Sequence, residues 1–174
     1  MIKNIAFIFL SFLSFQVLAQ NRLTVVDTQK LSAAQMKNIQ QLVYKDGWVH
    51  IIHQGEHYVT NYSNRDYTLF FSLKCQDPAG PPYFLIEYSD NYGDGTYGGI
   101  DLVSSRQSNG QKITFTVDGT SFGNPFQPAD KKGFSRFVAA LKKGKSLRIK
   151  IDPDRDMQFK LAHPEFLDIP VKCR

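Results

Sequence analysis

The sequence predicts a mainly β (α+β) fold, an antiparallel β-sandwich or curled sheet with one or two packed helices. Three observations lead to this fold class. The 174-residue chain contains 14 Phe and 8 Tyr, and aromatic and β-branched residues favour strands. Gly, Pro, Asn and Asp recur between short apolar runs, where they indicate turns. Several of these runs alternate apolar and polar residues, as strands do in a sheet with one buried face.

The first 19 residues have the three parts of a secretory signal peptide. Lys3 supplies a positive charge, residues 5–13 are apolar apart from Ser11, and Val17-Leu18-Ala19 provides a cleavage site. A single membrane anchor is the alternative, but it needs about 20 uninterrupted apolar residues, and this run is shorter. We therefore expect cleavage near Ala19 and a periplasmic or secreted protein without a membrane span.

Removal of residues 1–19 leaves 155 residues, which suits one β-rich domain over 20–174. Cys75 and Cys173 are the two cysteines of the chain. In an oxidising compartment such a pair most simply forms one disulfide. The bond would close a loop of about 100 residues, for which the loop-entropy model gives about 4 to 5 kcal/mol of stabilisation.

The first elements of the mature chain are a strand and a helix. Residues 22–28 have strand character, and Ser32 and Gln35 then have the spacing of a capping box. Apolar residues at helical spacing follow, which predicts a helix that starts near Leu31 and ends before Gly47. A competing interpretation folds residues 42–52 into a hairpin around an Asp-Gly pair.

From Trp48 onward, turn residues separate short strands and one further helix. A core-facing stripe with i, i+3, i+4, i+7 spacing begins at Phe134 and predicts a helix over about 131–143. The predicted strands are 48–53, 57–62, 67–76, 83–89, 100–105, 111–117, 146–151, 157–161 and 169–173.

The net charge of +5 is modest, and part of it clusters between Lys131 and Lys150. A nucleic-acid groove interleaves such charge with exposed aromatic residues, whereas the interleaved residues here look like core. We expect a solvated face and no nucleic-acid partner. An acidic protein surface remains compatible with this charge.

Three histidines, His50, His53 and His57, raise the question of a metal site. Zinc binds histidines that meet in space, but strand geometry places His50 and His53 on opposite faces, and Gly55 turns the chain before His57. We expect strand and turn histidines and no metal. Gly-x-Ser-x-Gly, HExxH and phosphate-binding motifs are missing from the sequence, so we expect neither an enzyme nor a cofactor.

Acidic residues of the segment after residue 89 have part of the spacing of a calcium loop. Asp90, Asp94 and Asp101 occupy positions 1, 5 and 12 of that pattern. Tyr92, however, stands where an oxygen ligand belongs, and position 12 normally holds a bidentate Glu. These three residues are the candidates for calcium ligands, and a plain hairpin loop is the alternative.

The segment Tyr88–Gly99 is our candidate for a functional loop. It is longer than a hairpin connection requires, and its tyrosines stand among Gly, Ser, Asn and Asp. Tyrosine offers a large contact area with few rotatable bonds, so this composition is frequent in protein recognition. An insertion that covers a sheet edge is the alternative. The residues that we expect to contact a protein partner are Tyr88, Asp90, Tyr92, Asp94 and Tyr97.

The chain resembles periplasmic immunity proteins and hydrolase inhibitors, such as those that protect against toxins delivered by type VI secretion. The resemblance lies in the signal peptide, the size of the β-rich domain and the long-range disulfide. The stretch from Phe134 to Gly144 and the strand from Leu147 to Ile151 are similar to a helix and strand of invasion-associated locus B proteins. The first resemblance implies a module that occludes a toxin or cell-wall hydrolase. The alternatives are an envelope domain that binds a small ligand or calcium, and an unrecognised hydrolase.

Overall fold

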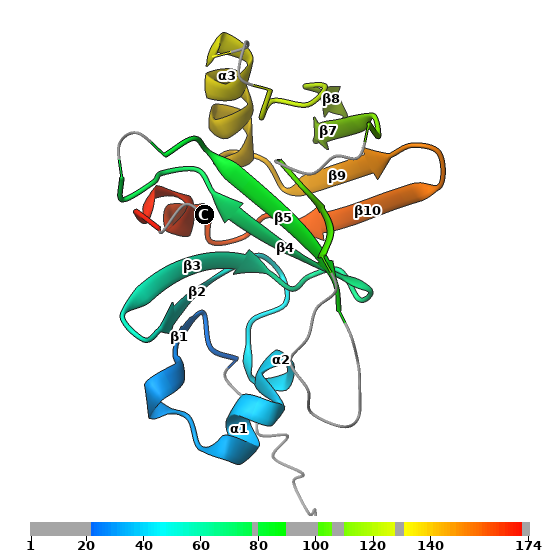
Figure 1. The fold of residues 1–174 in the computed structure, drawn as a ribbon. Helices are drawn as coiled ribbons and strands as arrows, with labels where there is room; N and C mark the ends of the chain where they lie inside the picture. Colours follow the sequence, from blue (N-terminus) through cyan, green and yellow to red (C-terminus); the bar gives the residue numbers. More distant parts are fainter. Residues whose placement is uncertain (1–21, 78–79, 90–100, 106–109, 128–130, 172–174) are drawn as a thin grey trace, which may run out of the picture.

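The structure is a computed structural model, which describes residues 22–77, 80–89, 101–105, 110–127 and 131–171. The predicted signal peptide therefore lies outside the described residues. Two β-sheets and several short helices form the fold (Figure 1). The predicted fold class is confirmed. In the described part of the chain, helices are too short and polar to cross a membrane.

One sheet has six strands in chain order, β1-β2-β3-β4-β5-β6. The pairs from β2 onward are antiparallel, whereas β1 runs parallel to β2, which the sequence pattern did not predict. The strand bounds are Val25–Asp27 (β1), Trp48–His53 (β2), Glu56–Asn61 (β3), Tyr67–Ser72 (β4), Tyr83–Tyr88 (β5) and Asp101–Ser104 (β6).

The second sheet has four antiparallel strands in the order β10-β9-β7-β8. Its strands alternate buried apolar and outward polar side chains, as in Leu147-Arg148-Ile149-Lys150-Ile151. The outward cations contact carboxylates, with Arg148 paired to Asp156 and Lys150 to Asp152, so this face is solvated as expected. The strand bounds are Ile113–Val117 (β7), Thr120–Ser121 (β8), Ser146–Ile151 (β9) and Arg155–Lys160 (β10).

Both sheets contribute to one main core, which also takes the apolar stripe of helix α3, Lys131–Leu141. Phe71 from the first sheet, Phe115 from the second and Phe137 from α3 lie within 6.4 Å of one another between ring centroids. Trp48 has no exposed surface and stacks on Phe71. Trp48 is therefore part of the main core.

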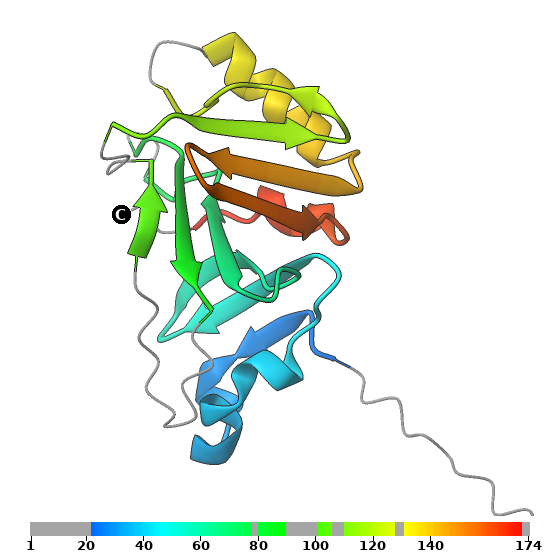
Figure 2. The same cartoon turned by 90° about the vertical axis from the view of Figure 1, so that its right-hand side faces the viewer.

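The N-terminal segment forms a second core on the opposite face of β2. Val49 and Ile51 pack there against Val26, Ile39 and neighbouring residues, so both faces of β2 are buried. The segment includes a 3₁₀ turn, η1 (Thr28–Lys30), and the helices α1 (Ala33–Lys37) and α2 (Ile39–Leu42). Figure 2 shows this segment at the far end of the molecule from α3.

The predicted continuous helix between Leu31 and Gly47 is wrong in one respect. Its capping box is confirmed, because Gln35 N–H donates to Ser32 Oγ and Ser32 N–H donates to Gln35 Oε1. The helix is broken at Asn38, whose backbone leaves the helical region (φ −119°, ψ 27°) and whose side chain donates to the Ala34 carbonyl. Asn competes for backbone hydrogen bonds in this way.

The C-terminal segment pairs with the residues just before β2 and shortly after β4. Gly47 and Ala162 form a parallel bridge, and so do Cys75 and Val171. The predicted strand at 169–173 is wrong for the described residues, since a 3₁₀ helix, η2 (Pro164–Asp168), precedes a single bridge at Val171. The strand predicted at 67–76 likewise ends at Ser72.

Candidate functional site

The predicted protein-binding loop is described only where it leaves the sheet. Tyr88 is the last residue of β5, and Asp101 is the first residue of β6. Asp90, Tyr92, Asp94 and Tyr97 lie outside the described residues. The calcium and protein-contact predictions for those four residues therefore remain predictions. The residues around the start of the loop are described.

Side chains from β4 and β5 hold the start of this loop. The ring centroids of Tyr88 and Tyr67 lie 5.4 Å apart. The pKa of Tyr67 is raised, mainly by burial and secondly by the nearby Tyr88. Ser89 N–H donates to the Asp66 carbonyl at 2.8 Å, and the hydroxyls of Ser89 and Thr68 are 2.9 Å apart. The loop therefore leaves the sheet from a fixed position.

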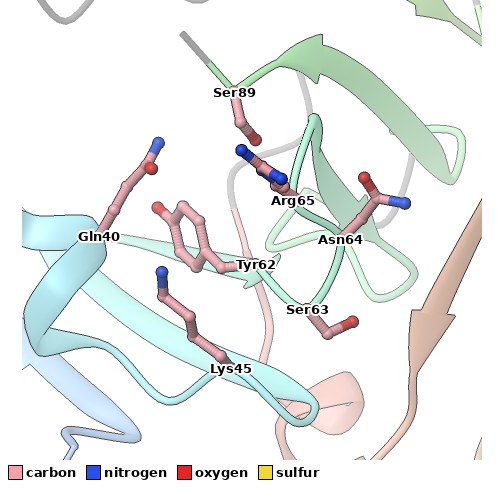
Figure 3. A pocket seen from close by; sticks show the side chains of 7 residues that line it. All are labelled: Gln40, Lys45, Tyr62, Ser63, Asn64, Arg65 and Ser89. Atoms are coloured by element: carbon pink, nitrogen blue, oxygen red, sulfur yellow. The ribbon is translucent and has the colours of Figure 1, made fainter. Parts of the chain in front are cut away.

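A polar hollow of about 360 Å³ lies directly beside Ser89 (Figure 3). Three segments that are distant in sequence form it: the end of α2 with the residues after it, the β3–β4 connection, and the end of β5. We call it the polar hollow, and its lining residues are Gln40, Lys45, Tyr62, Ser63, Asn64, Arg65 and Ser89.

The β3–β4 connection is attached to β10 by its short polar side chains. The buried Asn61 donates to the Lys160 carbonyl at 2.7 Å, and Asn64 donates to the Gln158 carbonyl at 3.1 Å. Ser63 Oγ accepts from Lys160 N–H at 2.7 Å. Ser63 and Asn64 accordingly point away from the other five lining residues (Figure 3). These bonds fix the backbone before the exposed Arg65. After it, Asp66 N–H and Tyr67 N–H donate to Asn64 Oδ1 at 2.9 and 3.1 Å.

The charge of the polar hollow is positive. Lys45 and Arg65 both line it, and the described lining residues include no carboxylate. Neither cation forms an ion pair or a side-chain hydrogen bond with another residue of the described ranges. By contrast, the neighbouring Asp46 is paired with Lys160. Two unpaired cations beside an amide, a phenol and a hydroxyl form an arrangement that binds carboxylate or phosphate groups.

Sequence reasoning missed the polar hollow. Gln40, Lys45 and Arg65 are isolated polar residues in three separate segments, and no spacing in the sequence links them. The one available signal is the Asn-Tyr-Ser-Asn run at 61–64, whose side chains favour local backbone hydrogen bonds and thus a rigid turn.

The histidines are arranged differently from the prediction. His50 and His53 do lie on opposite faces of β2, but His50 Nε2 lies 2.8 Å from His57 Nδ1, and their rings stack at 5.0 Å. Both are half-buried rather than exposed. In the antiparallel register, His57 on β3 lies opposite Ile52 on β2. Ile52 is two residues after His50, so His50 and His57 are diagonal neighbours, whose side chains can touch. In the described ranges, no three His, Cys, Asp or Glu residues gather as metal ligands would.

This histidine pair predicts a pH dependence of stability. Burial and then the adjacent His57 lower the pKa of His50. The unfolded chain therefore binds more protons than the native state, and the free energy of unfolding falls as the pH drops below the ordinary histidine pKa of about 6.5. We expect a lower melting temperature at pH 5 than at pH 7.5, with a smaller difference for His50→Gln. His53→Gln is the control, and an equal effect of both substitutions would contradict this assignment.

The family of the chain follows from its middle part. A family model described as YfjT matches residues 46–163, about two-thirds of the sequence. The chain belongs to the YfjT family. The region shared with the YfjT family runs from Asp46 to His163, three residues after β10, and it includes Arg65 and Ser89 but not Gln40 or Lys45. Comparisons with curated proteins and with solved structures each return no match.

Proposed function

We propose that this member of the YfjT family is an exported protein-binding module that inhibits a toxin or cell-wall hydrolase by occlusion. The observation that carries the proposal is the pair of cations, Lys45 and Arg65, around the polar hollow, neither of which has an ion-pair partner among the described residues. This hollow lies where the tyrosine-containing loop leaves β5. A cationic, rigidly held surface beside such a loop suits an acidic protein partner.

The chemistry of cell-wall hydrolysis gives this charge a direct target. Most glycoside hydrolases use a pair of Asp or Glu residues that flank the bond to be cleaved. A guanidinium such as that of Arg65 matches a carboxylate with two parallel hydrogen bonds, and Lys45 adds a second positive charge. An inhibitor that presents these groups to a hydrolase cleft would block the cleft and neutralise its catalytic carboxylates.

The fixed backbone around Arg65 supports binding by a preformed surface. Hydrogen bonds from the β3–β4 connection to β10 restrain Asn61, Ser63 and Asn64 before any partner arrives. Preorganisation of this kind reduces the entropy lost on binding. The side chain of Arg65 stays exposed and is therefore available to a partner.

The test compares two arginines of the same exposure. Mature protein with Arg65→Glu is used as bait in periplasmic and secreted extracts, beside wild-type bait and an Arg136→Glu control on the exposed side of α3. Both substitutions change the net charge equally. We expect wild type and Arg136→Glu to capture the same hydrolase, and Arg65→Glu to bind it at least tenfold more weakly, since charge reversal leaves a carboxylate facing carboxylates.

Capture must be accompanied by inhibition. The captured hydrolase should clear a peptidoglycan suspension, and wild-type protein should stop the clearing at stoichiometric amounts. Equal capture by Arg65→Glu and wild type would contradict the placement of the site at the polar hollow. Capture of a protein whose activity is unaffected would contradict inhibition by occlusion.

A further inference from the structure

A second, mainly apolar cavity lies on the same face of the six-stranded sheet as the polar hollow. Its volume is about 520 Å³, which is within the range of small-molecule sites. Tyr62 lines both spaces and so forms a wall that they share. We call it the apolar cavity, and its lining residues are Thr28, Met36, Ile39, Ile51, His53, Tyr58, Thr60, Tyr62, Phe70, Ser72, Tyr83, Leu85 and Glu87.

The sheet register explains why apolar side chains line this space. Thr60, Phe70 and Leu85 stand directly opposite one another on β3, β4 and β5, so they form a row across one face of the sheet. The second core, with Ile39 of α2, covers the part of this face nearest β1. Phe70 and Leu85 are only half-buried, which leaves apolar surface open beside that core.

Thr60 lines the apolar cavity, and its hydroxyl is an unused hydrogen-bonding group buried beneath neighbouring side chains. The residue has no exposed surface, and its hydroxyl has no hydrogen-bond partner among the described residues. Buried polar groups are nearly always paired, and each exception calls for an explanation. A ligand group that enters between the surrounding side chains would give this hydroxyl the partner that the described protein does not provide.

The lining also restricts the chemistry of a ligand. Four aromatic side chains, those of Tyr58, Tyr62, Phe70 and Tyr83, offer faces and edges to a ring. The described lining residues include no Lys or Arg but do include Glu87, so an anion finds no counter-charge comparable with that of the polar hollow. An acyl chain would keep its polar end at the mouth of the cavity. That end would then lie away from Thr60, which is covered by its neighbours. A compact ring with one polar atom fits better.

We propose that the apolar cavity binds a small, uncharged aromatic molecule whose hydroxyl or carbonyl group hydrogen-bonds to Thr60. This site is separate from the protein-binding surface proposed above, apart from the shared wall at Tyr62. The failure of either proposal therefore leaves the other standing.

The probe for this proposal is 2-naphthol, an uncharged double ring with one hydroxyl. We expect saturable one-to-one binding to the mature protein, followed by amide chemical shifts in NMR spectra, with the largest changes at Thr60, Phe70 and Leu85. Thr60→Val keeps the shape of the side chain and removes its hydroxyl. It should weaken the affinity for 2-naphthol about fivefold and raise the melting temperature of the protein without probe, because a buried unpaired hydroxyl is lost.

Thr114→Val is the matched control, since Thr114 lies on β7 in the other sheet and should leave the affinity unchanged. Leu85→Trp fills the apolar cavity and should abolish binding. Should Leu85→Trp not fold, the comparison of Thr60→Val with Thr114→Val still decides the question. The proposal is overturned by the lack of saturable binding at millimolar 2-naphthol, by equal affinity of Thr60→Val and wild type, or by full binding to a folded Leu85→Trp protein.

Discussion

Cys75→Ser is expected to lower the free energy of unfolding by about 4 kcal/mol, because the substitution would remove a cross-link that closes a loop of about 100 residues. The described residues place the two ends of this loop together. Cys75 and Val171 form a parallel β-bridge. Gln76 N–H donates to the Val171 carbonyl, and Val171 N–H donates to the Lys74 carbonyl, both at 2.9 Å. Val171 precedes Cys173 by two residues. Cys75, the cysteine within the described ranges, is not a free thiol. Its bond to Cys173 remains a prediction, since Cys173 lies outside the described residues.

The measurement is urea unfolding with and without a reducing agent. Wild type under reducing conditions should match Cys75→Ser under either condition, because both then lack the cross-link. If reduction leaves the wild-type unfolding midpoint unchanged, the disulfide does not form or does not contribute. A Cys173→Ser protein should behave as Cys75→Ser does, which separates loss of the bond from any local effect of the serine.

Gly47→Ala is expected to destabilise the fold by about 3 kcal/mol or more through a backbone clash. A Cβ atom at position 47 would lie 2.1 Å from the carbonyl oxygen and 2.5 Å from the nitrogen of Ala162. These are main-chain atoms that cannot turn aside as a side chain can. Moving them would break the hydrogen bonds from Trp48 N–H to Ala162 O at 2.9 Å and from Ala162 N–H to Asp46 O at 3.2 Å.

The control for this prediction is Gly119→Ala. Gly119 has a positive φ of 85° but open space around its Cα, so alanine there meets backbone strain alone, at a cost of about 1 kcal/mol. Thermal and urea unfolding of both variants measure the difference. Equal destabilisation would mean that the parallel bridge between Gly47 and Ala162 can separate without cost.

The strands could be predicted because each has a pattern that its own residues determine. The strands predicted at 111–117, from its alternation, and at 146–151 agree with the structure within two residues. The N-terminal helix was predicted as one element because its apolar spacing continues past Asn38, whereas the break depends on a side-chain hydrogen bond. The missed β8 has two exposed residues, which is too short for any periodicity.

The site could not be predicted in the same way, because it depends on contacts between distant segments. Lys45 and Arg65 meet at one hollow only because β3 returns alongside β2, and the His50–His57 pair depends on the register of those two strands. The loop at Tyr88–Gly99 was selected from its composition, which identifies a kind of segment but not its neighbours. Composition gave no sign of the cationic residues beside that loop.

The two parallel bridges of the C-terminal segment also bear on how the chain folds. Residues 160–171 supply partners for Asn61, Gly47 and Cys75, which are about 100 residues earlier in the sequence. In the export that we propose, the N-terminal part of the chain crosses the membrane first, so the strands of the larger sheet are available well before these partners. Folding dominated by such distant contacts is slow, and incomplete chains present unpaired strand edges that favour aggregation. The native topology can therefore close only after residues 160–171 have become available to these partners.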